Sequence, residues 1–162
     1  MKPQHMLCLA VCVVVLICDT QAQKPSQPKP GTTQPTIEYL ARTGSGTAPL
    51  SEAVRVGQLL YLSGQLGVDG SGALAAGGIK AETKQALENI RNILERNHSG
   101  MDQVVKCLVM LADIGDRSAM NEVYSTFFPK DRLPARSTFG TTGLALGAKI
   151  EIECIAAIKQ GP

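Results

Sequence analysis

The stretch Val104-Val105-Lys106-Cys107-Leu108-Val109-Met110-Leu111 decides the fold, because its apolar run is typical of a strand that lies between two helices. Before it, apolar residues recur at helical spacing over residues 79–94. After it, a second helical stripe covers residues 120–128 and stops where Pro129 blocks continuation. The centre of the chain is therefore predicted to be helix, strand, helix.

Strand-like segments flank this central unit. Residues 37–41 favour a short edge strand, and residues 53–63 favour a hairpin that turns near Gly57. Residues 134–138 and 149–154 favour two further strands. This order predicts an α+β domain with a single mixed sheet covered on one face by two helices. The other face would lack cover, and an oligomer is the most economical way to supply it.

The first residues form a different kind of segment. Lys2 precedes an apolar run over residues 6–18, and the small residue Ala22 follows shortly after it. This pattern predicts a secretory signal peptide over residues 1–22. The run is short for a membrane span, so we expect no stable membrane insertion after cleavage; an uncleaved anchor is the alternative.

The composition changes again after the signal peptide. Residues 23–36 are rich in Pro, Gln, Ser and Thr and are predicted to form an extended linker, which leaves residues 37–162 as the folded domain. We therefore expect an exported protein, periplasmic or secreted, in which the linker acts as a spacer or a tether.

Charge and composition argue against several classes of function. The 162 residues carry a net charge of +2, Lys and Arg form no cluster, and Trp is absent. Such a surface does not suit nucleic acid, so we expect neither a nucleic-acid partner nor an RNA-cleaving activity. Histidines are scarce, and no Ser-His-Asp pattern occurs. We expect no metal site and no cofactor.

Two cysteines remain once the signal peptide is removed, Cys107 and Cys154. Each lies within an apolar strand-like run, where a free thiol usually packs as a small hydrophobic group. We expect two free thiols. A disulfide would be the alternative if their strands were adjacent, because disulfide geometry is demanding.

Arg136 and Glu151 are the candidate site residues that the pattern itself suggests. Side chains two apart on a strand share a face, so Arg136 and Thr138 point one way, and Glu151 lies on the face opposite to its apolar neighbours Ile150 and Ile152. We expect their strands to be neighbours within one compact domain, so that the guanidinium could hold a small carboxylate beside a water that Glu151 orients. The alternative is a cross-strand ion pair on a solvated sheet face.

Several motifs together resemble the RidA (YjgF) family, the reactive intermediate or imine deaminases, over residues 37–158. They follow the order and nearly the spacing of that family. The motifs are Ala53-Val54-Arg55-Val56-Gly57, Leu60-Tyr61-Leu62-Ser63-Gly64-Gln65, Gln85-Ala86-Leu87-Glu88-Asn89-Ile90, Val104-Val105-Lys106, Ala119-Met120-Asn121-Glu122-Val123-Tyr124, Pro134-Ala135-Arg136-Ser137 and Ile150-Glu151-Ile152-Glu153. The resemblance implies a chorismate-mutase-like fold and a homotrimer with sites at the subunit interfaces.

The resemblance also implies roles for individual residues. Arg136 would bind the substrate carboxylate and Glu151 would serve the hydrolytic water. Gly64 and Thr138 would line the pocket with main-chain groups, and Asn121 would be a pocket-side amide. Without the resemblance, these three would be a hairpin glycine, a strand threonine and a helix-surface amide.

One position departs from the family pattern. Where the family usually has a tyrosine before the first hairpin, this chain has Leu50 in Ala48-Pro49-Leu50-Ser51. We expect Leu50 to make the pocket more apolar and to favour imines with larger side chains. The implied activity is hydrolysis of 2-imino or enamine acids to 2-keto acids and ammonia. The alternatives are a small-carboxylate binding protein without turnover and a chaperone-like interaction protein.

Overall fold

The computed structural model describes residues 34–42 and 49–159. The predicted signal peptide, residues 1–22, and most of the predicted linker, residues 23–36, lie outside this part of the chain. Among the described residues, no helix has the length and apolar character needed to cross a membrane.

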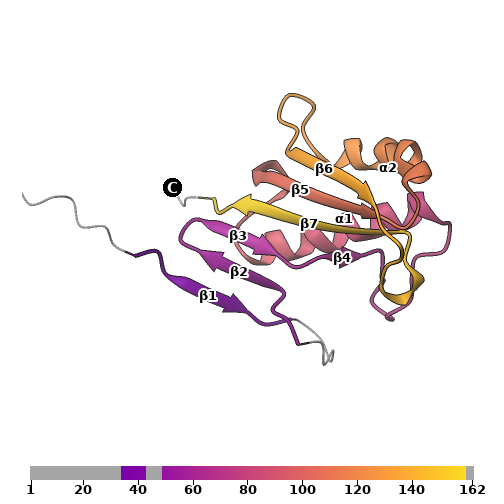
Figure 1. Cartoon of the computed structure of the whole chain (residues 1–162). Coiled ribbons are helices and arrows are strands. Elements are labelled where there is room, and N and C mark those ends of the chain that lie inside the picture. The colour runs from indigo at the N-terminus through magenta and orange to yellow at the C-terminus, as the bar shows by residue number, and fades with distance from the viewer. Residues whose placement is uncertain (1–33, 43–48, 160–162) are drawn as a thin grey trace, which may run out of the picture. The chain divides into compact units, whose positions relative to one another are not determined.

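The described residues form one sheet and two helices (Figure 1). The strands are β1 (Ile37–Leu40), β2 (Ala53–Val56), β3 (Leu59–Leu62), β4 (Gln65–Leu66), β5 (Val104–Leu111), β6 (Ala135–Gly140) and β7 (Ile150–Ala157). The helices are α1 (Ile79–Arg96) and α2 (Arg117–Tyr124), and short 3₁₀ turns occur at Met101–Gln103, Ile114–Asp116, Ser125–Phe127 and Ala145–Gly147. The predicted order of elements is confirmed.

The sheet has the strand order β1-β2-β3-β7-β5-β6, with β4 also paired to β7. Among the described strands, only β5 and β6 run parallel, because α2 crosses over between them, and the other pairs are antiparallel. The predicted single mixed sheet is therefore confirmed. The predicted hairpin is β2–β3, which turns at Gly57 with a φ of 58°, a left-handed value that favours glycine.

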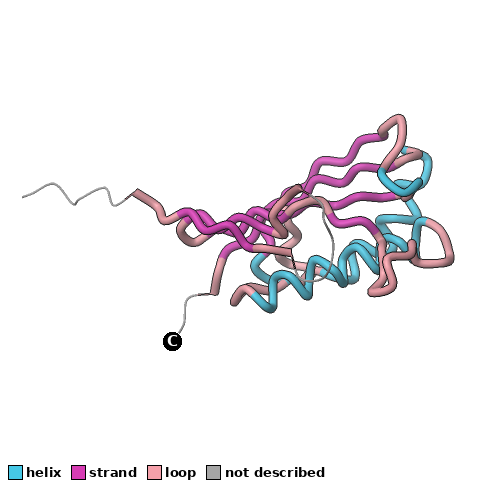
Figure 2. Tube along the Cα trace, turned by 90° about the horizontal axis from the view of Figure 1, so that it is seen from below, coloured by secondary structure: helices cyan, strands magenta, loops and turns pink. Residues whose placement is uncertain are grey.

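Both helices lie on one side of the sheet (Figure 2). The core forms there because β7 alternates strictly: Ile150, Ile152 and Cys154 are buried, whereas Glu151 and Glu153 point to the other side. The buried stripe of α1, which includes Leu87, Ile90 and Leu94, packs in the same core.

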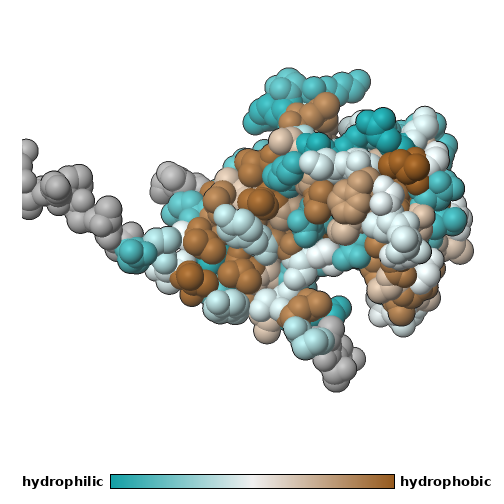
Figure 3. Space-filling view, viewed as in Figure 1, coloured by the Kyte–Doolittle hydropathy of each residue, from teal (hydrophilic) through white to brown (hydrophobic). Residues whose placement is uncertain are grey.

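The other side of the sheet, which we call the open face, has no helix over it in the described part of the chain (Figure 2). Figure 3 shows many apolar side chains on this side. Tyr61 on the inner strand β3 and Phe139 on the edge strand β6 are 42% and 44% exposed, although both are large aromatic residues. The sheet register places these apolar side chains on the open face: Ile37, Tyr39, Val54, Tyr61, Leu108, Met110, Phe139 and Ile155.

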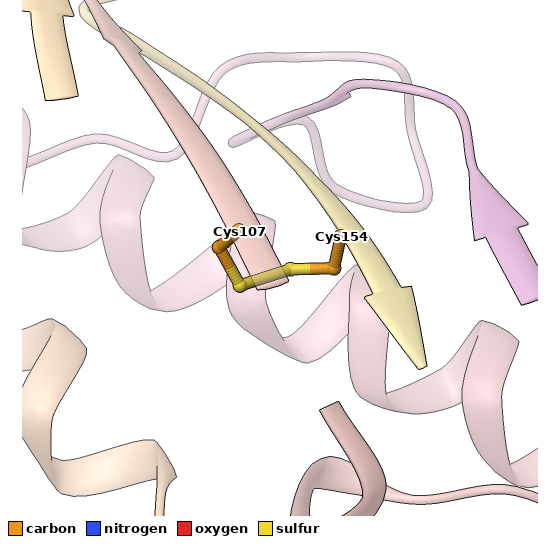
Figure 4. The surroundings of a disulfide bond; sticks show 2 residues. All are labelled: Cys107 and Cys154. Carbon is orange, nitrogen blue, oxygen red and sulfur yellow. A yellow bond between two sulfur atoms is a disulfide. The ribbon is translucent and has the colours of Figure 1, made fainter. Parts of the chain in front are cut away.

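The cysteines correct one expectation. Cys107 of β5 and Cys154 of β7 are direct cross-strand partners and form a disulfide rather than two free thiols (Figure 4). Their Cα atoms are 4.3 Å apart, as in the closely spaced pairs of an antiparallel ladder. The two residues are 47 positions apart in the sequence, so only the strand order could show that they are neighbours.

We expect this disulfide to stabilise the fold by reducing the number of conformations available to the unfolded chain. Replacing both Cys107 and Cys154 by Ala in the chain that starts at Gln23 should lower the free energy of unfolding by roughly 2–4 kcal/mol. Urea unfolding with and without a reductant checks this, because the reductant should weaken the native chain and leave the variant unchanged. Two free thiols in the denatured native protein would contradict it.

Candidate functional site

A cavity of about 650 Å³ lies beside β4, between α1 and the turn at residues 145–146. Three of the predicted site residues line it, namely Leu50, Gly64 and Glu151. We call these three residues the glutamate side. The structure therefore brings together residues that are about 100 positions apart along the sequence.

Gly64 allows the Glu151 side chain to lie directly against the backbone. A Cβ atom at position 64 would stand 2.8 Å from Glu151 Cδ and 3.0 Å from Cγ, and it would also collide with Oε1. The approach arises at a bulge, because residues 62–64 face only residues 153–154 of β7. Within the described residues, the Glu151 carboxylate has no hydrogen-bond donor and no cationic partner.

Polar contacts from α1 hold the walls of this cavity. Asn89 Nδ2 donates to the carbonyls of Leu66 and Val68 at 3.1 and 2.9 Å, which ties β4 to the helix. Arg96 bonds both carboxylate oxygens of Glu52 at 2.9 and 3.0 Å and so joins the end of α1 to the start of β2. These contacts satisfy groups that would otherwise be free to bind a ligand in the cavity.

Glu82 is a supporting residue that the sequence analysis did not identify. It is 5% exposed, and its carboxylate accepts a hydrogen bond of 2.7 Å from the backbone N–H of Lys149. Lys149 precedes Glu151 by two residues, so Glu82 fixes the start of β7. The only signal for this role in the sequence is an acidic residue in the first turn of a helix, which is common.

Arg136 lies on the helix-covered side of the sheet. Its cross-strand partner on β5 is the buried Cys107. The guanidinium Cζ sits 4.5 Å from the centre of the Tyr124 ring, and one guanidinium nitrogen is 3.9 Å from Met120 Sδ. No carboxylate among the described residues pairs with this half-buried guanidinium.

Two other predicted residues belong to the same region. Thr138 is two residues from Arg136 on the same face of β6, and its buried Oγ1 lacks a hydrogen-bond partner in the described part of the chain. Asn121 is half-buried on α2, three residues before Tyr124. We call Asn121, Arg136 and Thr138 the arginine side.

The expected pairing of Arg136 with Glu151 on neighbouring strands is wrong for a single copy. β5 lies between β6 and β7, and the two side chains point to opposite faces of the sheet. Two strand spacings and three residues separate them, roughly 14 Å between Cα atoms. The crossover through α2 is the physical reason, because it moves β6 to the far edge of the sheet. A surface ion pair between them is excluded for the same reason.

Ligand groups for a metal are not assembled in the described ranges, where no three His, Cys, Asp or Glu side chains come together. The arrangement instead offers one unneutralised guanidinium and one unneutralised carboxylate. Such groups can bind a small anion and accept a proton from water.

These features define the class of protein: an α+β protein that carries site residues on both faces of one mixed sheet. The chain belongs to the family described as Endoribonuclease L-PSP, to which the RidA and YjgF proteins belong, and that family's model matches residues 43–158.

Individual relatives agree with this assignment. The chain is 45% identical to a 2-iminobutanoate/2-iminopropanoate deaminase of Capra hircus, over 75% of this chain and 88% of the relative. It is 42% identical to the Homo sapiens protein of the same name, with the same coverage. Among solved structures, yeast Mmf1 matches with a TM-score of 0.71 and 30% identity, over 76% of this chain and all of that one. RidA from Psychrobacter matches with a TM-score of 0.66 and 36% identity, over 70% and 92%.

Three glycine-to-alanine substitutions should separate the role of Gly64 from ordinary packing. Gly64→Ala should move the Glu151 carboxylate, because a flexible side chain can yield, and should cost about 1 kcal/mol or less in unfolding free energy. Gly67→Ala should cost about 3 kcal/mol, since its Cβ would stand 2.6 Å from the Glu82 carbonyl oxygen in the helix backbone.

Gly143→Ala is the matched control, because nothing lies within 4 Å of its Cβ position. Chemical denaturation and crystal structures of the variants check the series. An unmoved Glu151 in the Gly64→Ala structure would contradict the close approach.

Proposed function

We propose that this protein hydrolyses reactive 2-imino and enamine acids to 2-keto acids and ammonia. The observation that carries the proposal is that Arg136 and Glu151 both lack an oppositely charged partner in the described part of the chain, although each is half-buried. Charged groups in such places usually find partners, so unneutralised ones indicate a binding or catalytic role. Relatives named as 2-iminobutanoate/2-iminopropanoate deaminases support the same reaction class.

The chemistry needs little beyond positioning. Arg136 holds the substrate carboxylate through paired N–H donors, which places the imine carbon beside a water at Glu151. The water oxygen forms a bond to the imine carbon, the C=N electron pair moves to nitrogen, and Glu151 takes the proton. Glu151 returns this proton to the nitrogen, which gives a carbinolamine with one hydroxyl and one amino group on the same carbon. Glu151 then takes the hydroxyl proton and delivers it to the amino nitrogen, so that the C–N bond breaks and ammonia leaves as the C=O bond forms.

A complete site in this mechanism requires two copies of the chain. One copy carries its arginine side and its glutamate side on opposite faces of the sheet, so we propose that the arginine side of one copy meets the glutamate side of the next. The exposed apolar residues of the open face support an oligomer, because such surface is usually covered by a partner. A homotrimer is the proposed assembly, in keeping with the family resemblance.

Leu50 adds a proposal on specificity. It lines the same cavity as Glu151 and is 51% exposed in the single chain. An apolar side chain there favours substrates with larger apolar groups, at about 0.8 kcal/mol for each buried methylene. The imine of leucine should therefore be preferred over that of alanine.

Export is also proposed, on the basis of the predicted signal peptide over residues 1–22. The disulfide between Cys107 and Cys154 supports it, because disulfides persist mainly in oxidising compartments. N-terminal sequencing of the protein expressed with its own leader tests this point, and a chain that keeps Lys2 would contradict it.

The activity can be tested by supplying freshly generated imines of alanine, 2-aminobutyrate and leucine to the protein and measuring the keto acid that forms. We expect Glu151→Gln to lower kcat about 100-fold or more and Arg136→Ala to lower kcat/KM by a similar factor. The matched controls are Glu153→Gln, two residues along the same face of β7, and Arg132→Ala, whose exposed side chain pairs with Asp131. Both should retain activity.

Two other outcomes would identify the alternative functions. Binding of the keto acid without turnover of any imine would identify a carboxylate-binding protein. Binding of unfolded proteins that does not depend on Arg136 would identify a chaperone-like protein.

Mixing the two inactive variants tests whether the site is shared. If each site takes Arg136 from one copy and Glu151 from the next, trimers refolded from an equal mixture of Arg136→Ala and Glu151→Gln chains should recover about a quarter of the native activity by random assembly. If both groups came from one copy, no mixed trimer would contain an intact site. No recovery after verified subunit exchange would therefore exclude the shared site.

A further inference from the structure

We propose that Tyr124 is a positioning residue: its ring holds the Arg136 guanidinium in place of a carboxylate. The charge of Arg136 then stays unneutralised, and its N–H donors other than the one that contacts Met120 Sδ stay free for the carboxylate of the substrate. This inference rests on the proposed function and assigns a role to a residue that the sequence pattern predicts only as part of a buried helical stripe.

The contacts around the guanidinium come from one face of α2. Met120 and Tyr124 are four residues apart, so both point toward β6, and both are buried. The Arg136 Cζ lies 4.5 Å from the Tyr124 ring centre, within the range of a cation–π contact. The ring is itself braced by Phe128, with ring centres 4.8 Å apart and planes tilted by 43°. Arg136 therefore rests on a rigid aromatic support.

A second stacked arginine, Arg91, differs from Arg136 because it also has a carboxylate partner. Arg91 also lies over a ring, that of Phe127 at 4.7 Å, but it forms an ion pair of 2.7 Å with Glu88 as well. Stacking on a ring thus does not prevent an arginine from pairing with a carboxylate. At Arg136 no carboxylate is within reach among the described residues, so the ring orients the guanidinium without neutralising it.

The Tyr124 hydroxyl does not neutralise Arg136 either. It is buried and has no hydrogen-bond partner within the described ranges. Burial raises the pKa of Tyr124 to about 12, and the opposing effect of the Arg136 charge is smaller. The side chain is thus a neutral phenol at physiological pH, and its aromatic ring is the part that contacts the guanidinium.

Three changes at position 124 separate the ring from the hydroxyl and from packing. Tyr124→Phe keeps the ring and should leave binding and turnover within about twofold of native. Tyr124→Leu removes the ring and should raise both KM and the Kd of 2-oxobutanoate about tenfold, with little change in kcat. Replacing Tyr124 by phenylalanines with increasing numbers of fluorines keeps the shape, weakens the negative ring face, and should raise the same Kd stepwise even if Tyr124→Leu fails to fold.

The control is Phe127→Leu, which removes the corresponding ring from Arg91 and should leave the Kd of 2-oxobutanoate unchanged. Thermal unfolding of each variant shows whether a change in Kd only follows a loss of stability. Equal losses in Tyr124→Phe and Tyr124→Leu would overturn the proposal, because the hydroxyl rather than the ring would then be needed. A Kd that does not respond to fluorination would also overturn it.

Binding of 2-oxobutanoate by calorimetry keeps this test separate from the proposed reaction. A native protein that binds the keto acid but turns over no imine would refute the deaminase activity, while the Tyr124 series would still give its answer. A native protein that binds no carboxylate at all would overturn the role of Tyr124 together with that of Arg136.

Discussion

The antiparallel pairing of β7 with β5 is the interaction on which the rest of the structure depends. β3 and β4 attach to one edge of β7, and β6 attaches to the far edge of β5. The cross-strand disulfide joins this central pair at Cys107 and Cys154. Because strand side chains alternate, a slip of one residue would turn Glu151 into the core and Ile152 out of it. The register of this one pair therefore decides both the core and the site.

The same pairing keeps two opposite charges apart. If Arg136 and Glu151 faced each other within one copy, they would form an ion pair and neutralise each other. On opposite faces, with β5 between them, each stays unpaired in the described part of the chain. Both groups thus remain available to a ligand, and the proposed mechanism requires an assembly of copies to bring them to one substrate. The strand order of the sheet, which is set when one chain folds, is therefore also the reason for the proposed assembly.

Much of the fold could be predicted from the residues themselves. Helical spacing over 79–94 corresponds to α1, and the alternation of Ile150 and Ile152 with Glu151 correctly separates the two faces of β7. The incorrect expectations share one cause. Adjacency of β6 and β7, and separation of the two cysteines, were both inferred without knowing the order of strands in the sheet.

The sequence by itself determined which segments are helices and strands, which side of each is apolar, and which residue types are available for chemistry. These properties are local, because they depend on side-chain spacing along a few turns or a few residues. Only the tertiary structure decided that Cys107 faces Cys154, that Gly64 touches Glu151, and that Arg136 rests on Tyr124. Those contacts join residues that are 12 to 87 positions apart in the sequence, and they follow from strand order and helix crossover, which no local pattern specifies.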